Sequence, residues 1–170
     1  MPIGWGIVST GRHPDIKMAP AINSTHDANI AAVVSRDLGR AKAFADKHRA
    51  SAAYDNLDAM LSDSAVDVVY IASPNALHAD QTIRAARAGK HVLVEKPMAL
   101  SVTDAQLMIN ECIGAGVQLG IDFHLRGHDG HRHLRDLILN GELGSIALAE
   151  ANWGRGTRGQ VKQPLRTGLQ

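Results

Sequence analysis

Short apolar runs, separated by longer stretches with apolar residues at helical spacing, are the main pattern along the chain. The runs are rich in Val, Ile and Ala and have the length of strands, which is typical of strands buried in a parallel sheet. We expect strands at residues 3–8, 30–34, 52–54, 66–72, 91–94 and 117–123.

The stretches between these runs predict helices with recognisable ends. Asp55 is a predicted N-cap, Ser101 and Asp104 occupy capping-box positions, and Gly89 is placed to end a helix. Pro20 is expected to kink or restart the first helix, because proline has no backbone N–H. The predicted helices span residues 18–22, 37–48, 57–61, 76–88, 101–115 and 131–139.

Strands that alternate with helices form βαβ units. The predicted fold class is therefore α/β, with a doubly wound parallel sheet of the Rossmann type that binds dinucleotides. We assign this domain to residues 1–123. The pattern changes after Gly144, where residues 146–153 predict one long strand, followed by a polar, Gly-rich and basic tail. Residues 124–170 are predicted to form a linking helix and only the start of a second, α+β domain.

Composition excludes several classes of function. With 170 residues, the chain has room for one good core and the start of another. The net charge of +1 offers no electrostatic case for nucleic acid or an anionic membrane surface, and the apolar runs are too short to span a membrane. The N-terminus lacks a basic-then-apolar signal, and the single cysteine, Cys112, excludes an internal disulfide. These features predict a cytoplasmic protein.

The turn after the first run is the first candidate site. Phosphate binding needs close backbone approach and free N–H groups at a helix N-terminus, and the small Ser9, Thr10 and Gly11 permit both. Arg12 follows directly and is also a candidate cofactor residue. A strict G-x-G-x-x-G is absent, so a plain βα turn remains an alternative.

The end of the second run suggests which cofactor would bind. In dinucleotide folds an acid at this point favours NAD, whereas an Arg accommodates the 2′-phosphate of NADP. Ser35 and Arg36 end the run, and Arg40 follows about one helical turn later. This set predicts NADP, although Asp37 leaves NAD as an alternative.

The fourth run is followed by Ser73, Pro74 and Asn75, which should also lie at the ligand-binding edge of the sheet. Asn75 both donates and accepts hydrogen bonds, so it is a candidate for holding the nicotinamide ribose. His78 lies in the first turn of the next helix, where packing or capping is as good an interpretation as function.

Charged residues directly after the fifth run carry the strongest chemical signal. Glu95, Lys96 and Pro97 stand where open α/β sheets bind ligands. Lys96 is the predicted catalytic residue, because a Lys beside a nicotinamide ring can polarise a carbonyl or relay a proton. An ordinary surface Lys is the alternative.

Four histidines, at positions 124, 128, 131 and 133, suggest a metal site, but the spacing argues against one. Gly127 and Gly130 are expected to interrupt the helix, and no Cys is nearby. We therefore predict no metal. His124 and Arg126 lie just beyond the sixth run and are candidates for facing the substrate.

The chain resembles the glucose–fructose oxidoreductase / inositol dehydrogenase (Gfo/Idh/MocA) family. The resemblance rests on Trp5-Gly6-Ile7, on Ser73-Pro74-Asn75 with His78, and on the specific segment from Gly89 to Pro97. The stretch around Leu119-Gly120 and His124-Leu125-Arg126 is most similar to the 1,5-anhydro-D-fructose reductase branch.

The resemblance implies NAD(P)-dependent hydride transfer at a carbon of a sugar or cyclitol, with Lys96 beside the nicotinamide. It also implies that Ser35 and Arg40 hold the 2′-phosphate, and that Asn75, His78, Glu95 and Asp122 lie near the cofactor. Asp122 stands where the branch has Asn, Ser9 replaces a Gly, and the segment before Pro20 is one residue longer.

Family members have a second domain that completes the substrate site and is often used for homo-oligomerisation. We interpret the chain as the N-terminal fragment of such an enzyme, acting on a sugar-like substrate. A non-catalytic dinucleotide-binding module is the alternative, and a complete small reductase is a third.

Overall fold

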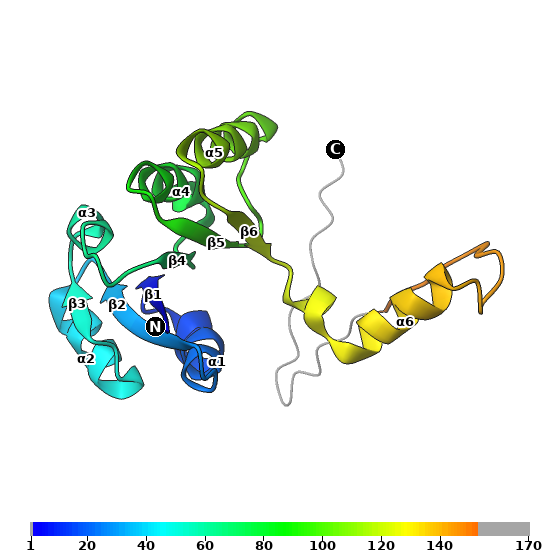
Figure 1. Ribbon diagram of the computed structural model, residues 1–170, viewed down its shortest axis with the longest axis horizontal. Helices are drawn as coiled ribbons and strands as arrows, with labels where there is room; N and C mark the ends of the chain where they lie inside the picture. Colours follow the sequence, from blue (N-terminus) through cyan, green and yellow to red (C-terminus); the bar gives the residue numbers. More distant parts are fainter. Residues whose placement is uncertain (1, 153–170) are drawn as a thin grey trace, which may run out of the picture. The chain divides into compact units, whose positions relative to one another are not determined.

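The computed structural model describes residues 2–152, and its backbone divides into two units, one ending at Leu125 and one beginning at Arg126. The first unit is built on a parallel sheet of six strands in the order β3-β2-β1-β4-β5-β6 (Figure 1). The strands are β1 Ile3–Val8, β2 Ala28–Val34, β3 Ala52–Tyr54, β4 Val68–Ile71, β5 His91–Glu95 and β6 Leu119–Asp122. The prediction of a doubly wound parallel sheet is confirmed.

Helices cross over between the strands. The α-helices are α1 Ala19–Asn23, α2 Leu38–His48, α3 Leu57–Leu61, α4 His78–Arg87, α5 Val102–Ala115 and, in the second unit, α6 Asp129–Leu139. Shorter helical turns are η1 Pro14–Met18, η2 Asn75–Leu77 and η3 His124–Gly127. At the start of α5 the predicted cap is confirmed, because the Ser101 hydroxyl accepts a hydrogen bond from the Asp104 amide at 3.0 Å.

Two predicted helix ends are wrong. Asn56, and not Asp55, caps α3, because its side-chain oxygen accepts from the Ala59 amide at 3.1 Å. Gly130 does not interrupt a helix, because α6 already begins at Asp129. His128 caps α6 by accepting from the Gly130 amide at 3.2 Å, which lets a glycine occupy the first turn.

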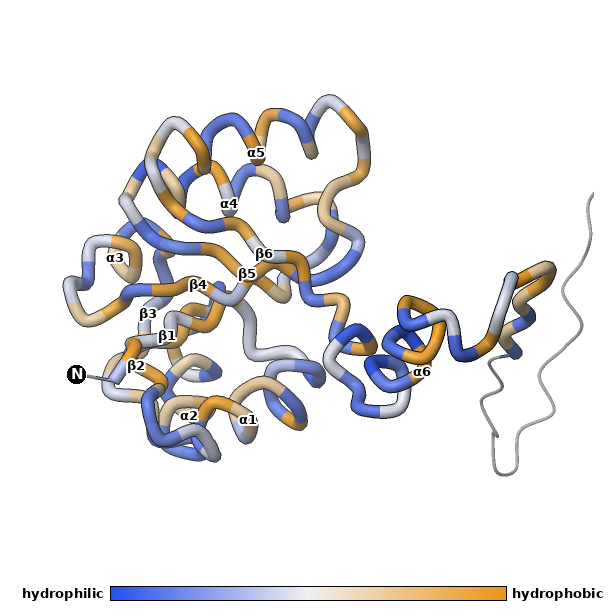
Figure 2. Tube along the Cα trace, turned by 45° about the vertical axis from the view of Figure 1, so that its right-hand side comes forward, coloured by the Kyte–Doolittle hydropathy of each residue, from blue (hydrophilic) through white to orange (hydrophobic). Residues whose placement is uncertain are grey.

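Apolar residues on the two faces of the sheet form two cores. Alternate residues of a strand point to opposite faces, so Ile7 packs with α1 and α2, whereas Val8 packs with α3, α4 and α5. Figure 2 shows the two helical layers on opposite sides of the sheet. Cys112 is buried within α5, as expected of a small hydrophobe.

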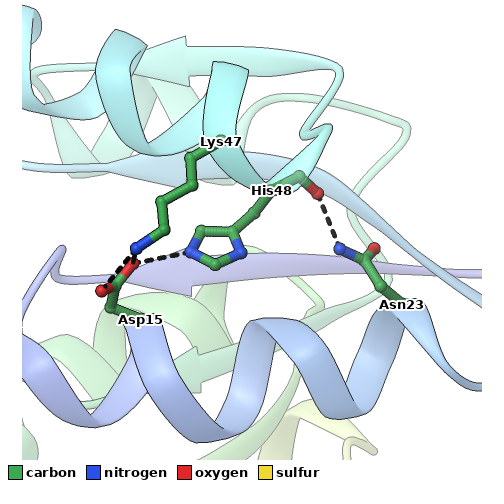
Figure 3. A network of polar contacts seen from close by, with 4 residues as sticks. All are labelled: Asp15, Asn23, Lys47 and His48. Atoms are coloured by element: carbon green, nitrogen blue, oxygen red, sulfur yellow. Dashed lines mark hydrogen bonds and ion pairs between the residues drawn. The ribbon is translucent and has the colours of Figure 1, made fainter.

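The segment between β1 and α1 contains a π-helical turn, η1, in which the Ala19 amide donates to the carbonyl of Pro14. A π turn accommodates one extra residue, which agrees with the longer segment noted before Pro20. Polar contacts join this segment to α2 (Figure 3): Asp15 contacts Lys47 at 2.8 Å and His48 at 2.7 Å. These hydrogen bonds, from His48 first and then from Lys47, lower the pKa of Asp15.

Close packing explains the first glycine of β1. A Cβ atom on Gly4 would collide with the carbonyl oxygen of Ala65, and the Gly4 amide donates to Asp67 at 2.8 Å. Gly4 therefore serves the contact between β1 and the loop before β4, away from the turn that is the candidate phosphate site.

The second unit contains α6 and residues that follow it. The predicted strand at 146–153 is wrong as far as the described residues reach, because residues 146–152 form no strand. A strand needs a hydrogen-bonded neighbour, and the described residues offer none to this segment. Among the helices of residues 2–152, none has both the length and the apolar composition that a membrane crossing requires.

Candidate functional site

The carboxyl ends of all six strands meet at one edge of the sheet. From β1 the chain moves outward through β2 and β3 on one side, and from β4 it moves through β5 and β6 on the other. The direction of winding therefore reverses between β1 and β4, and ligands of open α/β sheets bind at this point. The loops after β1, β2, β4 and β5 carry most of the predicted site residues.

A cavity of about 370 Å³ opens on the β1–β2–β3 side of this edge. Its walls include eight of the predicted cofactor residues: Ser9, Thr10, Gly11, Ser35, Arg36, Arg40, Ser73 and Pro74. The remaining lining residues are Val8, Val34, Asp55, Leu57, Leu77 and Gln81. The structure thus brings together residues from three loops that the sequence reasoning had considered separately.

A hydroxyl contact and a backbone hydrogen bond connect the loops after β1 and β2 at the cavity wall. Thr10 Oγ1 lies 3.4 Å from Ser35 Oγ, and the Ser9 amide donates to the carbonyl of Val34 at 3.0 Å. Ser9 has a φ of 103°, a conformation that suits glycine, and its hydroxyl accepts from the Gly11 amide at 3.2 Å. The turn therefore resembles a phosphate-binding turn in which a side chain already occupies one amide.

Asp37 has a structural task beside the cavity. Its carboxylate caps α2 by accepting from the Arg40 amide at 2.7 Å, and it does not line the cavity. Arg36 and Arg40 do line it and are exposed; the Arg40 side chain is 63% accessible. Arg36 and Arg40 thus line the cavity, while the Asp37 carboxylate caps the helix and also lies 4.0 Å from Arg40 Nε.

A cluster of ionisable groups lies at the ends of β5 and β6. Glu95 and Asp122 are paired in the register of these strands, so two carboxylates lie side by side. Glu95 Oε1 accepts from the hydroxyl of Tyr70 at 2.8 Å and contacts His13 Nε2 at 2.9 Å. Its other oxygen accepts from the Lys96 amide at 3.2 Å. We call His13, Tyr70, Glu95 and Asp122 the carboxylate cluster.

The carboxylate cluster shifts the titration of its members. Burial, the charge of Glu95 and a hydrogen bond with Glu95 together raise the pKa of Asp122. Burial and the neighbouring Glu95 raise the pKa of Tyr70. Both effects favour a proton held within the cluster over two adjacent negative charges.

The sequence pattern did not indicate His13, Tyr70, Asp55 and Gln81 as site residues. Tyr70 stands in an apolar run and is fully buried, so nothing in the pattern marked its hydroxyl. Asp55 follows β3, and the end of a strand was the signal that could have identified it. His13, Glu95 and Asp122 present donor atoms within 4.8 Å of one another, a geometry that can hold a metal ion. Glu95 already has hydrogen bonds on both oxygens, and the absence of a metal stays a prediction.

The other predicted residues are placed as follows. Lys96 is exposed after β5, and its peptide bond to Pro97 is cis. Arg12 and Asn75 are exposed in loops at the same edge. The His124 ring lies 6.4 Å from that of His13, beside the carboxylate cluster. Arg126 belongs to the second unit, and its role in substrate binding stays a prediction.

His78 has different surroundings. Its side chain is fully buried at the start of α4, and both ring nitrogens lie within 3.0 Å of backbone carbonyl oxygens. Of the two interpretations that the sequence left open, these surroundings favour packing.

Comparison with known proteins identifies the fold and its relatives. Residues 3–123 match the model of an oxidoreductase family with an NAD-binding Rossmann fold, Gfo/Idh/MocA. The chain is 35% identical to a 1,5-anhydro-D-fructose reductase of Ensifer adhaerens, over 82% of this chain and 42% of the relative. It is 37% identical to a D-xylose 1-dehydrogenase (NADP(+)) of Haloferax volcanii, over 88% of this chain and 45% of the relative.

A solved structure of KijD10, a 3-ketoreductase from Actinomadura kijaniata, in complex with TDP-benzene and NADP is similar in fold. The TM-score is 0.78 at 30% identity, over 83% of this chain and 44% of that one. The chain spans less than half the length of these relatives.

Proposed function

Because this chain belongs to the Gfo/Idh/MocA family of oxidoreductases, we propose that it binds NADP(H) in preference to NAD(H) and supplies the cofactor half of a sugar or cyclitol oxidoreductase. The observation that carries the preference for NADP(H) is the lining of the cavity beside β2. Arg36, Arg40 and Ser35 line it, whereas the nearby Asp37 caps α2 and pairs with Arg40 at 4.0 Å.

The chemistry of this lining suits a phosphate monoester. Guanidinium groups bind phosphate oxygens with planar, often bidentate hydrogen bonds, and a hydroxyl adds a further donor. If the Asp37 carboxylate faced the cavity, it would instead accept hydrogen bonds from the two ribose hydroxyls of NAD(H). Asp55 also lines the cavity, and we propose that it accepts hydrogen bonds from the adenosine part of the cofactor.

The remaining residues at the edge fit the other half of a dinucleotide. The turn at residues 9–12 would hold the pyrophosphate, and Asn75 would hold the nicotinamide ribose. The nicotinamide, when bound, carries the hydride. Lys96 would donate a proton to the substrate oxygen as a carbonyl is reduced, or remove one from a hydroxyl that is oxidised.

The substrate class comes from the relatives. Their names include an anhydrofructose reductase, a xylose dehydrogenase and a 3-ketoreductase, which are names of enzymes that act on carbon atoms bearing hydroxyl or carbonyl groups. We propose a sugar-like substrate, with His124 and Arg126 as candidate contacts and a homo-oligomer as the assembled form.

The preference for NADP(H) is tested by titrating the purified protein with NADPH and NADH and following the fluorescence of the reduced cofactor. We expect tighter binding of NADPH, and Arg36→Ala and Arg40→Ala should each weaken NADPH by about tenfold, or 1.4 kcal/mol, while leaving NADH unchanged. Arg87→Ala is the matched control, because the side chain of Arg87 is 66% accessible, similar to that of Arg40, and pairs with Glu111. Equal affinities for the two cofactors would refute the preference.

The role of Lys96 is tested by turnover with NADPH and a keto sugar such as 1,5-anhydro-D-fructose, measured on a form of the enzyme that also contains the substrate half. Lys96→Met should lower kcat by about 10²–10⁴-fold, the usual contribution of a general acid or base, with NADPH affinity retained. A protein that binds NADPH and turns over none of the sugars tried would favour the alternative, a non-catalytic dinucleotide-binding module.

A further inference from the structure

His78 connects two loops that are far apart in the sequence. Its ring is fully buried at the first residue of α4. Nδ1 lies 2.9 Å from the carbonyl oxygen of Pro97, and Nε2 lies 3.0 Å from the carbonyl oxygen of Ser73. One side chain therefore contacts the backbone after β4 and the backbone after β5.

Both partners of the ring are acceptors, which restricts its chemistry. A carbonyl oxygen cannot donate, so each ring nitrogen must carry a proton to form a hydrogen bond. A neutral imidazole has one N–H and could serve only one of the two carbonyls. The other ring nitrogen then lies against the second carbonyl as a close polar contact, so the ring still touches both loops.

The two carbonyls belong to the two loops that matter most for the proposed function. Ser73 lines the cavity and precedes Asn75, whereas Pro97 directly follows Lys96. Residues of α4 hold Ser73 at a second point, because its hydroxyl donates to Gln81 Oε1 at 2.6 Å. The beginning of α4 is thus a rigid support behind both loops.

We propose that His78 is a positioning residue: it clamps the cofactor-binding loop at Ser73 and the Lys96 loop at Pro97 through the contacts that its two ring nitrogens make with the carbonyl oxygens of these residues. The inference rests on the proposed function for what the loops do, whereas the clamp itself rests on the two contacts. His78 then sets the distance between the cofactor loop and the Lys96 loop without touching cofactor or substrate.

Two substitutions separate the halves of the clamp. The amide nitrogen of Asn can occupy the place of Nδ1, so His78→Asn should keep the Pro97 contact and lose the Ser73 contact. The amide nitrogen of Gln reaches the place of Nε2, so His78→Gln should keep the Ser73 contact and lose the Pro97 contact. The structure offers one reporter amide for each loop: Leu77, which donates to Pro74 at 2.8 Å, and Lys96, which donates to Glu95 at 3.2 Å.

Amide hydrogen exchange in the 170-residue protein tests the clamp. His78→Gln should speed exchange at Lys96 by about tenfold with Leu77 unchanged, and His78→Asn should do the reverse, as expected for the loss of one buried hydrogen bond. NADPH affinity should fall by about tenfold in His78→Asn and by less than about twofold in His78→Gln. Equal acceleration of both amides in both variants would overturn the clamp and leave a residue that only supports folding.

A measurement on the unmodified protein decides the matter even if the variants do not fold. In ¹⁵N-detected NMR of the histidine rings, each ring nitrogen of His78 should show contact with the carbonyl that the structure places beside it; a ring nitrogen without a carbonyl neighbour would overturn the double contact. If the unmodified protein fails to bind NADPH, the proposed function fails, while the exchange pattern and the contacts of the ring nitrogens still test the clamp.

Discussion

Charged groups on the β2 side of the site are exposed, whereas Glu95 on the β5 side is largely buried and hydrogen-bonded. Beside β2, Arg36 and Arg40 are exposed and face a cavity; the Arg40 side chain is 63% accessible. At the end of β5, the Glu95 side chain is 12% accessible and is bonded to Tyr70, His13 and the Lys96 amide. Exposed cations in a cavity are available to a ligand, whereas a carboxylate with both oxygens engaged already has its partners inside the protein.

This difference indicates that side chains on the β2 side mainly determine ligand affinity, whereas those on the β5 side mainly determine stability. On the β2 side, Arg36 and Arg40 are exposed, so substitutions of these two residues should change affinity with little effect on stability. On the β5 side, the carboxylate cluster is part of the folded structure, so substitutions should change stability and its pH dependence first.

The largest effect is expected for Ser35→Asp, which places a carboxylate beside Arg36 and Arg40. We expect NADPH affinity to fall about 100-fold, or about 2.7 kcal/mol, through charge repulsion, and NADH affinity to stay the same or rise. Fluorescence titration with both cofactors measures this. Ser64→Asp adds the same charge at an exposed position and is the control. An equal loss for NADPH and NADH would show that Ser35 does not face the 2′-phosphate.

Tyr70→Phe should produce the next largest effect, and on stability alone. It removes a buried hydroxyl that donates to Glu95, so unfolding by urea should show a loss of about 2 kcal/mol, typical of a buried hydrogen bond to a charged group. Tyr54→Phe is the matched control, because its hydroxyl donates to Asp63 at 2.9 Å in a half-buried position, and its loss should be smaller. A larger effect of Tyr70→Phe on NADPH affinity than on stability would remove the distinction between the two sides.

Ser9→Gly tests the turn between the two sides. Glycine adopts a φ of 103° without strain, so stability should rise by about 1 kcal/mol. The change also frees the Gly11 amide for a phosphate oxygen, so NADPH affinity should rise. Ser9→Ala keeps the strain and removes the hydroxyl, and it should lower stability. If both variants changed stability in the same direction, strain at Ser9 would not be the cause.

The smallest effect is a change in pH dependence. The pKa of Asp122 is raised in the folded protein, so its contribution to stability is present below the unfolded value of about 3.8 and is lost as the pH rises through the folded pKa. Asp122→Asn removes the titrating carboxylate, so the stability should no longer fall through this group as the pH rises. At neutral pH it should stabilise the protein by about 0.5–1 kcal/mol, the range for like charges paired across strands, and near pH 3 it should have no effect.

Asp15→Asn is the opposite control, because hydrogen bonds from His48 and Lys47 lower the pKa of Asp15. Its contribution is present above the unfolded pKa and is lost as the pH falls, so this variant should be less stable than the unmodified protein at neutral pH. Urea unfolding at a series of pH values measures both variants. If the two variants changed the free energy of unfolding in the same direction across the pH series, the opposite roles of Asp122 and Asp15 would be contradicted.

The sequence alone determined the order of strands and helices, because periodicity and end signals such as Ser101 and Gly89 are local properties. It also determined which side carries the cations, since Ser35, Arg36 and Arg40 follow directly from the end of a predicted strand. Over residues 146–152, which the structure describes, the expected strand is absent for a non-local reason, because a strand exists only where a neighbour pairs with it.

The tertiary structure decided what depends on contacts between distant residues. Tyr70 and Glu95 are 25 residues apart, and Glu95 meets Asp122 only because β5 and β6 are paired in register. Pro97 reaches His78 across 19 residues. Side chains of this kind acquire their charge state and their partners from burial and from the sheet order, and neither is written in the local pattern of residues.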